Sequence, residues 1–98
     1  MAAYVISEVE ILDEPSANEY RTRAAASIEK YGGKYIVRGA EAHVVEGAAT
    51  RRRIVIVEFP SMRRVREWYG SAEYAEALKW RAQALERRLI FVEGLSAT

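Results

Sequence analysis

Three glutamates beside strand-like segments are the first candidates for chemistry in this sequence. Glu8, Glu58 and Glu93 each adjoin a short run of β-branched or aromatic residues. Carboxylates that crowd together away from water bind a proton more tightly, and one of them can then serve as a general base. We therefore predict Glu58 and Glu8 as catalytic residues and Glu93 as a substrate-binding residue. The alternative is that all three are solvated or salt-bridged at the rim of a sheet, where most glutamates lie.

Two other side chains are expected to hold a substrate near these glutamates. The planar guanidinium of Arg38 can bind a carboxylate through two parallel hydrogen bonds. Tyr4 lies on the same face of the first strand-like segment as Glu8, because every second side chain along a strand points to the same side. An ion pair of Arg38 with Glu58 or Glu8 is the alternative for the arginine.

His43 and Trp68 are the remaining candidates for substrate binding. His43 is the only histidine, and an imidazole exchanges protons near neutral pH; a surface or packing role is its alternative. Trp68 precedes a Gly-Ser break between two helical segments, where it either packs in the core or lines the mouth of an apolar cleft. With one histidine and no cysteine, the chain lacks the ligands of the common zinc sites, and we expect neither a metal nor a cofactor.

Apolar periodicity indicates which elements position these residues. Alternation with a period of two predicts strands, and apolar residues at helical spacing after Asp13, Ser61 and Ser71 predict helices capped by those residues. The expected strands cover 3–11, 34–38, 52–59 and 88–93, with a short edge strand at 43–46, and the last helix covers about 72–86. This order predicts an α+β fold, a ferredoxin-like βαββαβ sandwich with an antiparallel sheet, in a single domain of residues 1–98.

Helices can cover only one face of such a sheet, so the other face requires an explanation. We assign the side chains of Val5, Val57 and Ile90 to the helix side. The opposite face then carries Tyr4, Glu8, Arg38 and Glu58 with an apolar patch of Ile6, Ile54, Ile56, Leu89 and Phe91. Because a large exposed apolar patch usually marks a partner or ligand site, we predict a homodimer in which two sheets face each other.

The composition argues against several functional classes. Fifteen Lys and Arg against fourteen Asp and Glu leave a formal net charge of +1, so nothing favours nucleic acid or an acidic membrane as a partner. The triplet Arg51-Arg52-Arg53 lacks the glycine and aromatic pattern of RNA-binding strands, and we interpret it as a solvated turn. The N-terminus begins with a strand-like segment and no apolar run reaches transmembrane length, so we expect a cytoplasmic protein.

Several short stretches of the chain resemble a known family. They are 31–39 (YGGKYIVRG), 45–47 (VEG), 57–61 (VEFPS), 68–74 (WYGSAEY) and 92–94 (VEG). Together they resemble the domain-of-unknown-function family 1330 over nearly the whole chain. The resemblance implies the dimeric α/β-barrel superfamily, and hence a homodimer whose two sheets close into a barrel. That superfamily contains cofactor-free monooxygenases, isomerases, dehalogenase-like enzymes and haem proteins, but the family itself offers no activity to carry over.

The sequence leaves two functions open, and with them the question of enzyme activity. In the first, a cleft between sheet and helices binds or transforms a small apolar or aromatic acid, which Arg38 orients while Glu58 or Glu8 moves a proton. In the second, the homodimer is a structural or accessory module without catalysis. A redox role, such as haem binding or quinol oxidation, would rest on analogy within the superfamily alone, with His43 as its one evident axial ligand.

Overall fold

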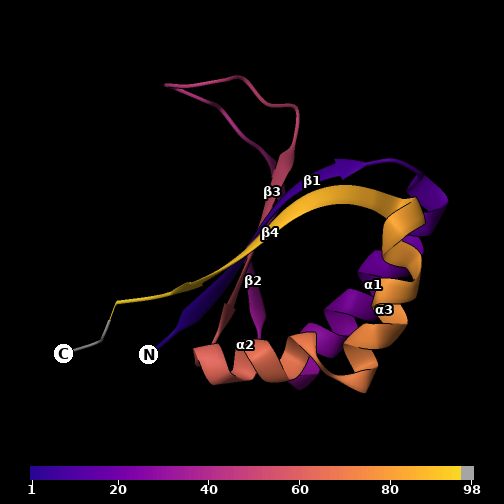
Figure 1. The fold of residues 1–98 in the computed structure, drawn as a ribbon, viewed down its shortest axis with the longest axis vertical. Helices are drawn as coiled ribbons and strands as arrows, with labels where there is room; N and C mark the ends of the chain where they lie inside the picture. The colour runs from indigo at the N-terminus through magenta and orange to yellow at the C-terminus, as the bar shows by residue number, and fades with distance from the viewer. Residues whose placement is uncertain (96–98) are drawn as a thin grey trace.

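An antiparallel sheet backed by helices on one side forms the structure, a computed structural model that describes residues 1–95 (Figure 1). The strand order in the sheet is β2-β3-β1-β4. Along the chain the elements are β1 (Ala3–Ile11), α1 (Glu14–Lys30), β2 (Lys34–Glu41), β3 (Arg53–Phe59), α2 (Met62–Tyr69), α3 (Ala72–Ala84) and β4 (Leu85–Glu93). The predicted ferredoxin-like α+β fold is confirmed, and the apolar strand β3 lies in the interior of the sheet.

Local signals start the helices where the sequence indicated, although α3 ends at Ala84 and not at about residue 86. Asp13 caps α1 by accepting a hydrogen bond from the backbone N–H of Ser16 at 3.0 Å. Ser61 and Ser71 cap α2 and α3 in the same way. Gly32 follows α1 with φ +83°, a left-handed conformation that glycine adopts without a steric cost.

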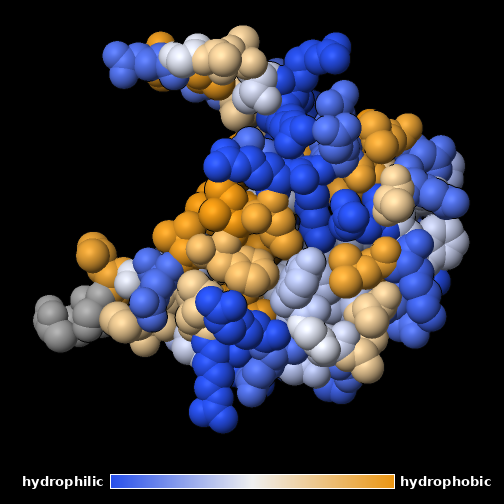
Figure 2. Space-filling model, in the orientation of Figure 1, coloured by the Kyte–Doolittle hydropathy of each residue, from blue (hydrophilic) through white to orange (hydrophobic). Residues whose placement is uncertain are grey.

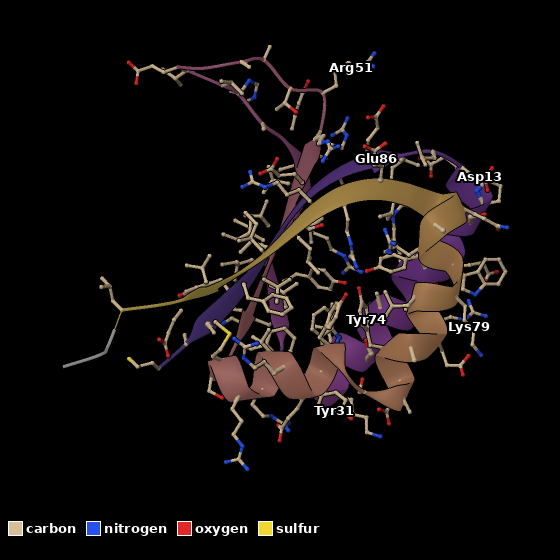
Figure 3. All side chains as sticks on the ribbon, in the orientation of Figure 1. Asp13, Tyr31, Arg51, Tyr74, Lys79 and Glu86 are labelled. Atoms are coloured by element: carbon tan, nitrogen blue, oxygen red, sulfur yellow. The ribbon has the colours of Figure 1, made fainter. Side chains whose placement is uncertain are left out.

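The hydrophobic core lies between the sheet and the helices. Trp68 of α2 and Tyr74 of α3 are 1% and 0% exposed. Tyr74 points from α3 toward the sheet, whereas Lys79 of the same helix points away from it (Figure 3). On the sheet side, burial alternates along β1 with a period of two, so one face of the sheet packs against the helices.

The strand register decides which residues share each face. β1 pairs antiparallel with both β3 and β4, and directly paired residues point to the same side. The face toward the helices, the covered face, carries Val5, Ser7, Val9, Val55, Val57, Arg87, Leu89 and Phe91. The opposite face, the open face, carries Tyr4, Ile6, Glu8, Ile54, Ile56, Glu58, Ile90 and Val92.

The faces predicted for β4 are wrong. Leu89 pairs with Ser7 and Phe91 pairs with Val5, so both side chains lie on the covered face, and Ile90 lies on the open face instead. The two alternating sets of β4 are equally apolar, so periodicity could not show which set faces the helices. Only the register against β1 decides it. The strand also begins earlier than the predicted residue 88.

β2 and the segment after it also differ from prediction. The strand continues through Gly39, whose φ of +79° suits an irregular strand, and its register against β3 shifts twice. These shifts change which side chains face the helices, and Arg38 pairs with Val55 on the covered face rather than lying on the open one. The predicted edge strand 43–46 is wrong, because these residues belong to the loop 42–52 that projects from the sheet (Figure 1).

Within residues 1–95 no helix covers the open face. The centre of this face is formed by Ile6, Ile54, Ile56 and Ile90. Figure 2 shows hydrophobic side chains gathered over the middle of the sheet, beside the hollow between the loop 42–52 and the end of β4. The predicted apolar patch therefore exists, with a changed contribution from β4. Among the described residues, none of the helices has the length and hydropathy needed to cross a membrane.

Candidate ligand-binding site

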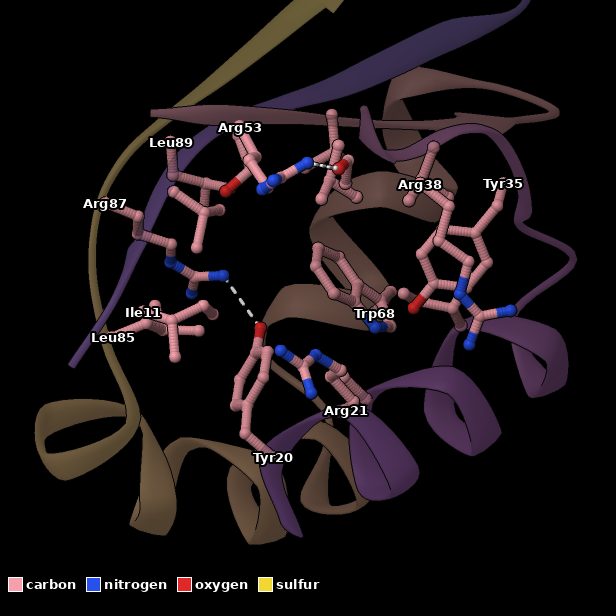
Figure 4. Close-up of a pocket in the computed structure, with 18 residues that line it drawn as sticks. Ile11, Tyr20, Arg21, Tyr35, Arg38, Arg53, Trp68, Leu85, Arg87 and Leu89 are labelled. Carbon is pink, nitrogen blue, oxygen red and sulfur yellow. Dashed lines mark hydrogen bonds between the residues drawn. The ribbon is translucent and has the colours of Figure 1, made fainter. Parts of the chain in front are cut away.

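A cavity of about 480 Å³ lies between the covered face and the helices α1 and α2 (Figure 4). All four strands and these two helices contribute to its wall. The lining is mainly apolar, and the volume falls in the range of pockets that hold small organic molecules. The polar and aromatic lining residues that matter most are Ser7, Tyr20, Arg38, Arg53, Trp68 and Arg87.

The strand register arranges the floor of the cavity. Ser7 occupies its centre, between apolar residues of β3 and β4. One step further along the same face of β1, Val9 pairs with Arg53 on one side and Arg87 on the other. Because neighbouring strands are about 4.8 Å apart, the serine and the two arginines start from one small region of the floor.

Arg87 is held in position by two tyrosines from the helices. Its Nη1 donates to the hydroxyl of Tyr20 on α1 at 2.7 Å, and its Nη2 donates to the hydroxyl of Tyr74 on α3 at 2.7 Å. The two hydroxyl oxygens are 2.6 Å apart and share a third hydrogen bond. Among residues 1–95 no carboxylate forms an ion pair with Arg87, so its charge is fixed in place without a counter-ion.

Burial and hydrogen bonding hold Arg87 and Tyr74 each in a single protonation state. Burial raises the pKa of the Tyr74 hydroxyl well above its usual range, and the neighbouring Tyr20 raises it further. For Arg87, burial alone would lower the pKa, but the two tyrosine hydroxyls outweigh this effect and the pKa is raised. Arg87 is therefore a cation and Tyr74 a neutral phenol at physiological pH, and neither can act as a base.

Three more arginines surround the mouth of the cavity. Arg21, Arg38 and Arg53 line it and are exposed. The guanidinium carbon of Arg38 is 4.2 Å from the ring centroid of Tyr35, and Arg53 donates to the carbonyl of Gly39 at 3.3 Å. In the part of the chain that the structure describes, no Asp, Glu or His lines the cavity. Arg21 forms an ion pair at 3.5 Å with Glu14, which lies outside the lining, whereas Arg38, Arg53 and Arg87 have no carboxylate partner among residues 1–95. The site therefore combines apolar walls with positive charge that is only partly compensated.

Two polar side chains in the cavity wall differ in whether their polar atom has a hydrogen-bond partner. Trp68 donates from Nε1 to the Oγ of Ser27 at 3.0 Å, so its polar group is used within the protein. Ser7 is 5% exposed, and its Oγ has no hydrogen-bond partner among the described residues. A buried hydroxyl without a partner is costly, so Ser7 is the lining residue that would gain most from a polar ligand group.

One family model matches the sequence over residues 2–95, and it is described as Domain of unknown function (DUF1330). The chain belongs to the DUF1330 family. The resemblance seen in the short motifs is thereby confirmed over almost the whole length of the protein. No curated protein matches this DUF1330 chain.

Solved structures share the fold of the DUF1330 chain at low sequence identity. A protein of unknown function from Rhodopseudomonas palustris is 21% identical with a TM-score of 0.79, over 97% of this chain and 83% of that one. A dimeric protein of unknown function and ferredoxin-like fold from Bacteroides fragilis is 18% identical with a TM-score of 0.61, over 95% and 96% of the two chains. SnoaB, a cofactor-independent oxygenase from Streptomyces nogalater, is 9% identical with a TM-score of 0.66, over 98% and 95%. At these identities the likeness establishes the fold.

The site residues predicted for the DUF1330 chain are divided between the two faces of the sheet. Arg38 and Trp68 line the cavity on the covered face. Tyr4, Glu8 and Glu58 lie on the open face, where Tyr4 pairs with Glu58 and Glu8 forms an ion pair at 3.5 Å with an arginine of β4. The sheet therefore separates the predicted acid–base residues from the arginine that was predicted to orient their substrate.

Glu93 and His43 lie apart from both groups. Glu93 is exposed at the end of β4, and His43 is exposed on the loop 42–52. Neither residue lines the cavity. Within residues 1–95 no three His, Cys, Asp or Glu side chains are grouped so that they could hold a metal ion.

Three polar residues of the cavity were missed by the sequence analysis, namely Ser7, Tyr20 and Arg87. Each interrupts an apolar pattern within its own element. Ser7 lies between valines on the covered face of β1, Arg87 alternates with leucines in β4, and Tyr20 adds a hydroxyl to the apolar stripe of α1. A polar group on a buried face must find a partner. These three polar residues were therefore the sequence feature from which a polar site on the covered face could have been predicted.

Proposed function

We propose that this DUF1330 protein is a homodimer in which each subunit binds a small apolar or aromatic acid in the cavity of the covered face. The observation that carries the proposal is the pairing of a ligand-sized apolar cavity with arginines that have no carboxylate in the lining. Apolar walls favour a hydrocarbon or aromatic body. The arginines favour a negatively charged group on that body.

The open face supports the dimer. Its isoleucines form a continuous apolar surface across β3, β1 and β4, and no helix of the described chain covers them. A second copy offers the same surface, as a two-fold symmetric interface requires. The Bacteroides fragilis protein of the same fold is dimeric, which is consistent with pairing through this face.

The cavity supports binding more directly than catalysis. Proton abstraction requires a positioned base, and among residues 1–95 the lining offers only arginine, tyrosine and serine as ionisable or hydroxyl groups. Such donors stabilise negative charge on a bound molecule. SnoaB, which shares the fold, is a cofactor-independent oxygenase, so catalysis without a cofactor is compatible with this architecture.

Titration calorimetry with 2-naphthoate, benzoate and octanoate tests the proposal. We expect the wild-type protein to bind 2-naphthoate with a dissociation constant of about 1 mM or tighter. Leu89→Trp fills the cavity and should abolish binding, whereas Ile90→Trp puts the same side chain on the open face and should preserve it. Failure of all three acids to bind the wild-type protein, or equal losses in the two folded variants, would overturn the proposal.

The predicted glutamates define a second candidate, in which chemistry takes place between two facing sheets. It is favoured by the position of Glu8 and Glu58 with Tyr4 on one face. If Glu58→Gln weakens binding of 2-naphthoate and Leu89→Trp does not, the ligand lies on the open face and this candidate replaces the first. A stable dimer that binds none of the acids would favour a structural or accessory homodimer.

A further inference from the structure

We propose that Ser7, Tyr20 and Arg87 form a carboxylate-binding subsite at the inner end of the cavity. The apolar body of the acid would extend from this subsite along the wall that includes Trp68 (Figure 4). The inference rests on the proposed function and deepens it, because it names the chemical group that is recognised and the atoms that recognise it. The ligand class is a small monocarboxylate with an aromatic or aliphatic body.

Ser7 provides the first independent observation. It lies on the covered face among valines, lines the cavity and is 5% exposed. Its Oγ has no partner among residues 1–95, although a serine at a strand position could be replaced by alanine or valine without a polar cost. A buried, unpaired hydroxyl on a residue that lines a cavity is explained if it donates to a ligand oxygen.

A count of hydrogens on the tyrosine pair provides the second observation. Each phenol has one hydrogen to donate, and both oxygens already accept from Arg87. Only one of the two hydrogens can lie between the oxygens of Tyr20 and Tyr74. Tyr74 is 0% exposed, whereas Tyr20 lines the cavity. When Tyr74 donates to Tyr20, no hydroxyl is left unpaired in the core and the hydrogen of Tyr20 is free to point into the cavity.

Arg87 is the arginine of the cavity best placed to recognise a small anion. Arg21, Arg38 and Arg53 are exposed, so water and salt screen their charges. Arg87 is partly buried and held by two hydrogen bonds. Its charge therefore acts in less polar surroundings, and it loses little side-chain freedom when a ligand binds. We assign the ligand carboxylate to Arg87 in preference to Arg38 for this reason.

The strand register lets Ser7 and Arg87 share one carboxylate. Ser7 pairs with Leu89, which makes Arg87 its diagonal neighbour on β4, and diagonal neighbours lie about 7–8 Å apart, with their Cβ atoms somewhat closer. The two side chains therefore start from neighbouring positions on one face, from which both can turn toward the same ligand group. Tyr20 reaches the same place from α1, since its hydroxyl is 2.7 Å from Nη1 of Arg87.

Calorimetry with 2-naphthoate and its neutral isostere 2-naphthamide tests the subsite. We expect the wild-type protein to prefer the carboxylate by about 10- to 100-fold. Tyr20→Phe should lower the affinity for 2-naphthoate about tenfold and leave that for 2-naphthamide almost unchanged. Tyr74→Phe is the matched control, because it also removes one of the two hydrogen bonds that hold Arg87 but leaves the hydroxyl of Tyr20 in the cavity lining; it should weaken the binding of 2-naphthoate clearly less than Tyr20→Phe does.

Each outcome of this experiment separates the subsite from the proposed function. Equal affinities for the two probes, or equal losses in Tyr20→Phe and Tyr74→Phe, would overturn the subsite while leaving binding in the cavity intact. Failure of the wild-type protein to bind either probe, and benzoate and octanoate as well, would overturn the proposed function itself.

Ser7→Ala adds a readout that does not depend on ligand. If the hydroxyl serves a ligand, its removal should leave the ligand-free protein at least as stable as the wild type, because an unpaired buried hydroxyl is removed. The same variant should bind 2-naphthoate about tenfold more weakly. Thermal unfolding that shows a clear loss of stability in Ser7→Ala would instead assign the hydroxyl a structural role and remove Ser7 from the subsite.

Discussion

The covered face and the open face are built from the same strands, and they leave different groups unsatisfied. On the covered face the helices exclude water, yet the Oγ of Ser7 lacks a partner and Arg87 lacks a counter-ion within the described chain. On the open face the isoleucines of β1, β3 and β4 are apolar, yet no helix removes them from water. The unsatisfied groups of each face therefore indicate what kind of molecule that face is suited to bind.

Under the proposed function, this difference assigns the small molecule to the covered face and the second chain to the open face. Polar groups held rigidly in an apolar cavity are suited to a ligand that carries a matching group. A broad apolar surface without polar groups at its centre is suited to another surface of the same kind. The glutamates that first suggested chemistry lie on the second face, whereas the groups best placed to bind an acid lie on the first.

The largest expected effect comes from breaking the packing of the covered face. Trp68→Ala removes a side chain that is 1% exposed and contacts Phe59 and Tyr74, and it should lower the free energy of unfolding by about 3–5 kcal/mol. Trp80→Ala is the control, because Trp80 is only partly buried and lies against Arg23; it should cost about 1 kcal/mol. Urea denaturation measures both, and comparable losses would contradict this picture of the core.

A charge on the open face should break the dimer while the subunit stays folded. Ile56→Lys places an ammonium group at the centre of the apolar patch, and two-fold symmetry brings in two such charges. We expect the dimer dissociation constant to rise about 100-fold or more, as measured by sedimentation equilibrium. Ala26→Lys adds the same charge on the exposed side of α1 and should leave association unchanged. A wild-type protein that is monomeric at micromolar concentration would contradict the assignment of the open face to a dimer interface.

The smallest expected effect concerns the polar contact that links α1 to α3 on the helix side of the sheet. Lys30 and the Tyr31 hydroxyl at the end of α1 both donate to the carboxylate of Glu73 in α3. The hydrogen bond from Lys30 is the main cause that lowers the pKa of Glu73 from 4.5 to about 2. A lowered pKa in the folded state means that the contribution to stability is present above pH 4.5 and is lost as the pH falls toward about 2.

Glu73→Gln checks this pH dependence. The variant should be less stable than the wild type near neutral pH, and the difference should shrink as the pH falls through the acidic range, because protonation then removes the charge from the wild type as well. Thermal unfolding at a series of pH values measures the difference. A stability difference that stays constant over the whole pH series would show that the charge of Glu73 does not stabilise the contact between α1 and α3.

The elements of the fold could be predicted from the sequence because their causes are local. Alternation in 3–11, the serine and aspartate caps, and the glycines after α1 act within a few residues of one another. The apolar patch of the open face could also be predicted in part, because Ile6, Ile54 and Ile56 alternate with the side chains that pack against the helices. The faces of β4 and the orientation of Arg38 could not, because both depend on pairing with another strand.

The candidate site depended on the tertiary structure still more strongly. The sequence by itself determined the element order, the single covered face and the presence of apolar residues that need a partner, because periodicity and capping are properties of neighbouring residues. Only the tertiary structure brought Ser7 of β1, Tyr20 of α1 and Arg87 of β4 around one cavity. These residues are far apart in the chain, and only strand register and helix packing bring them together.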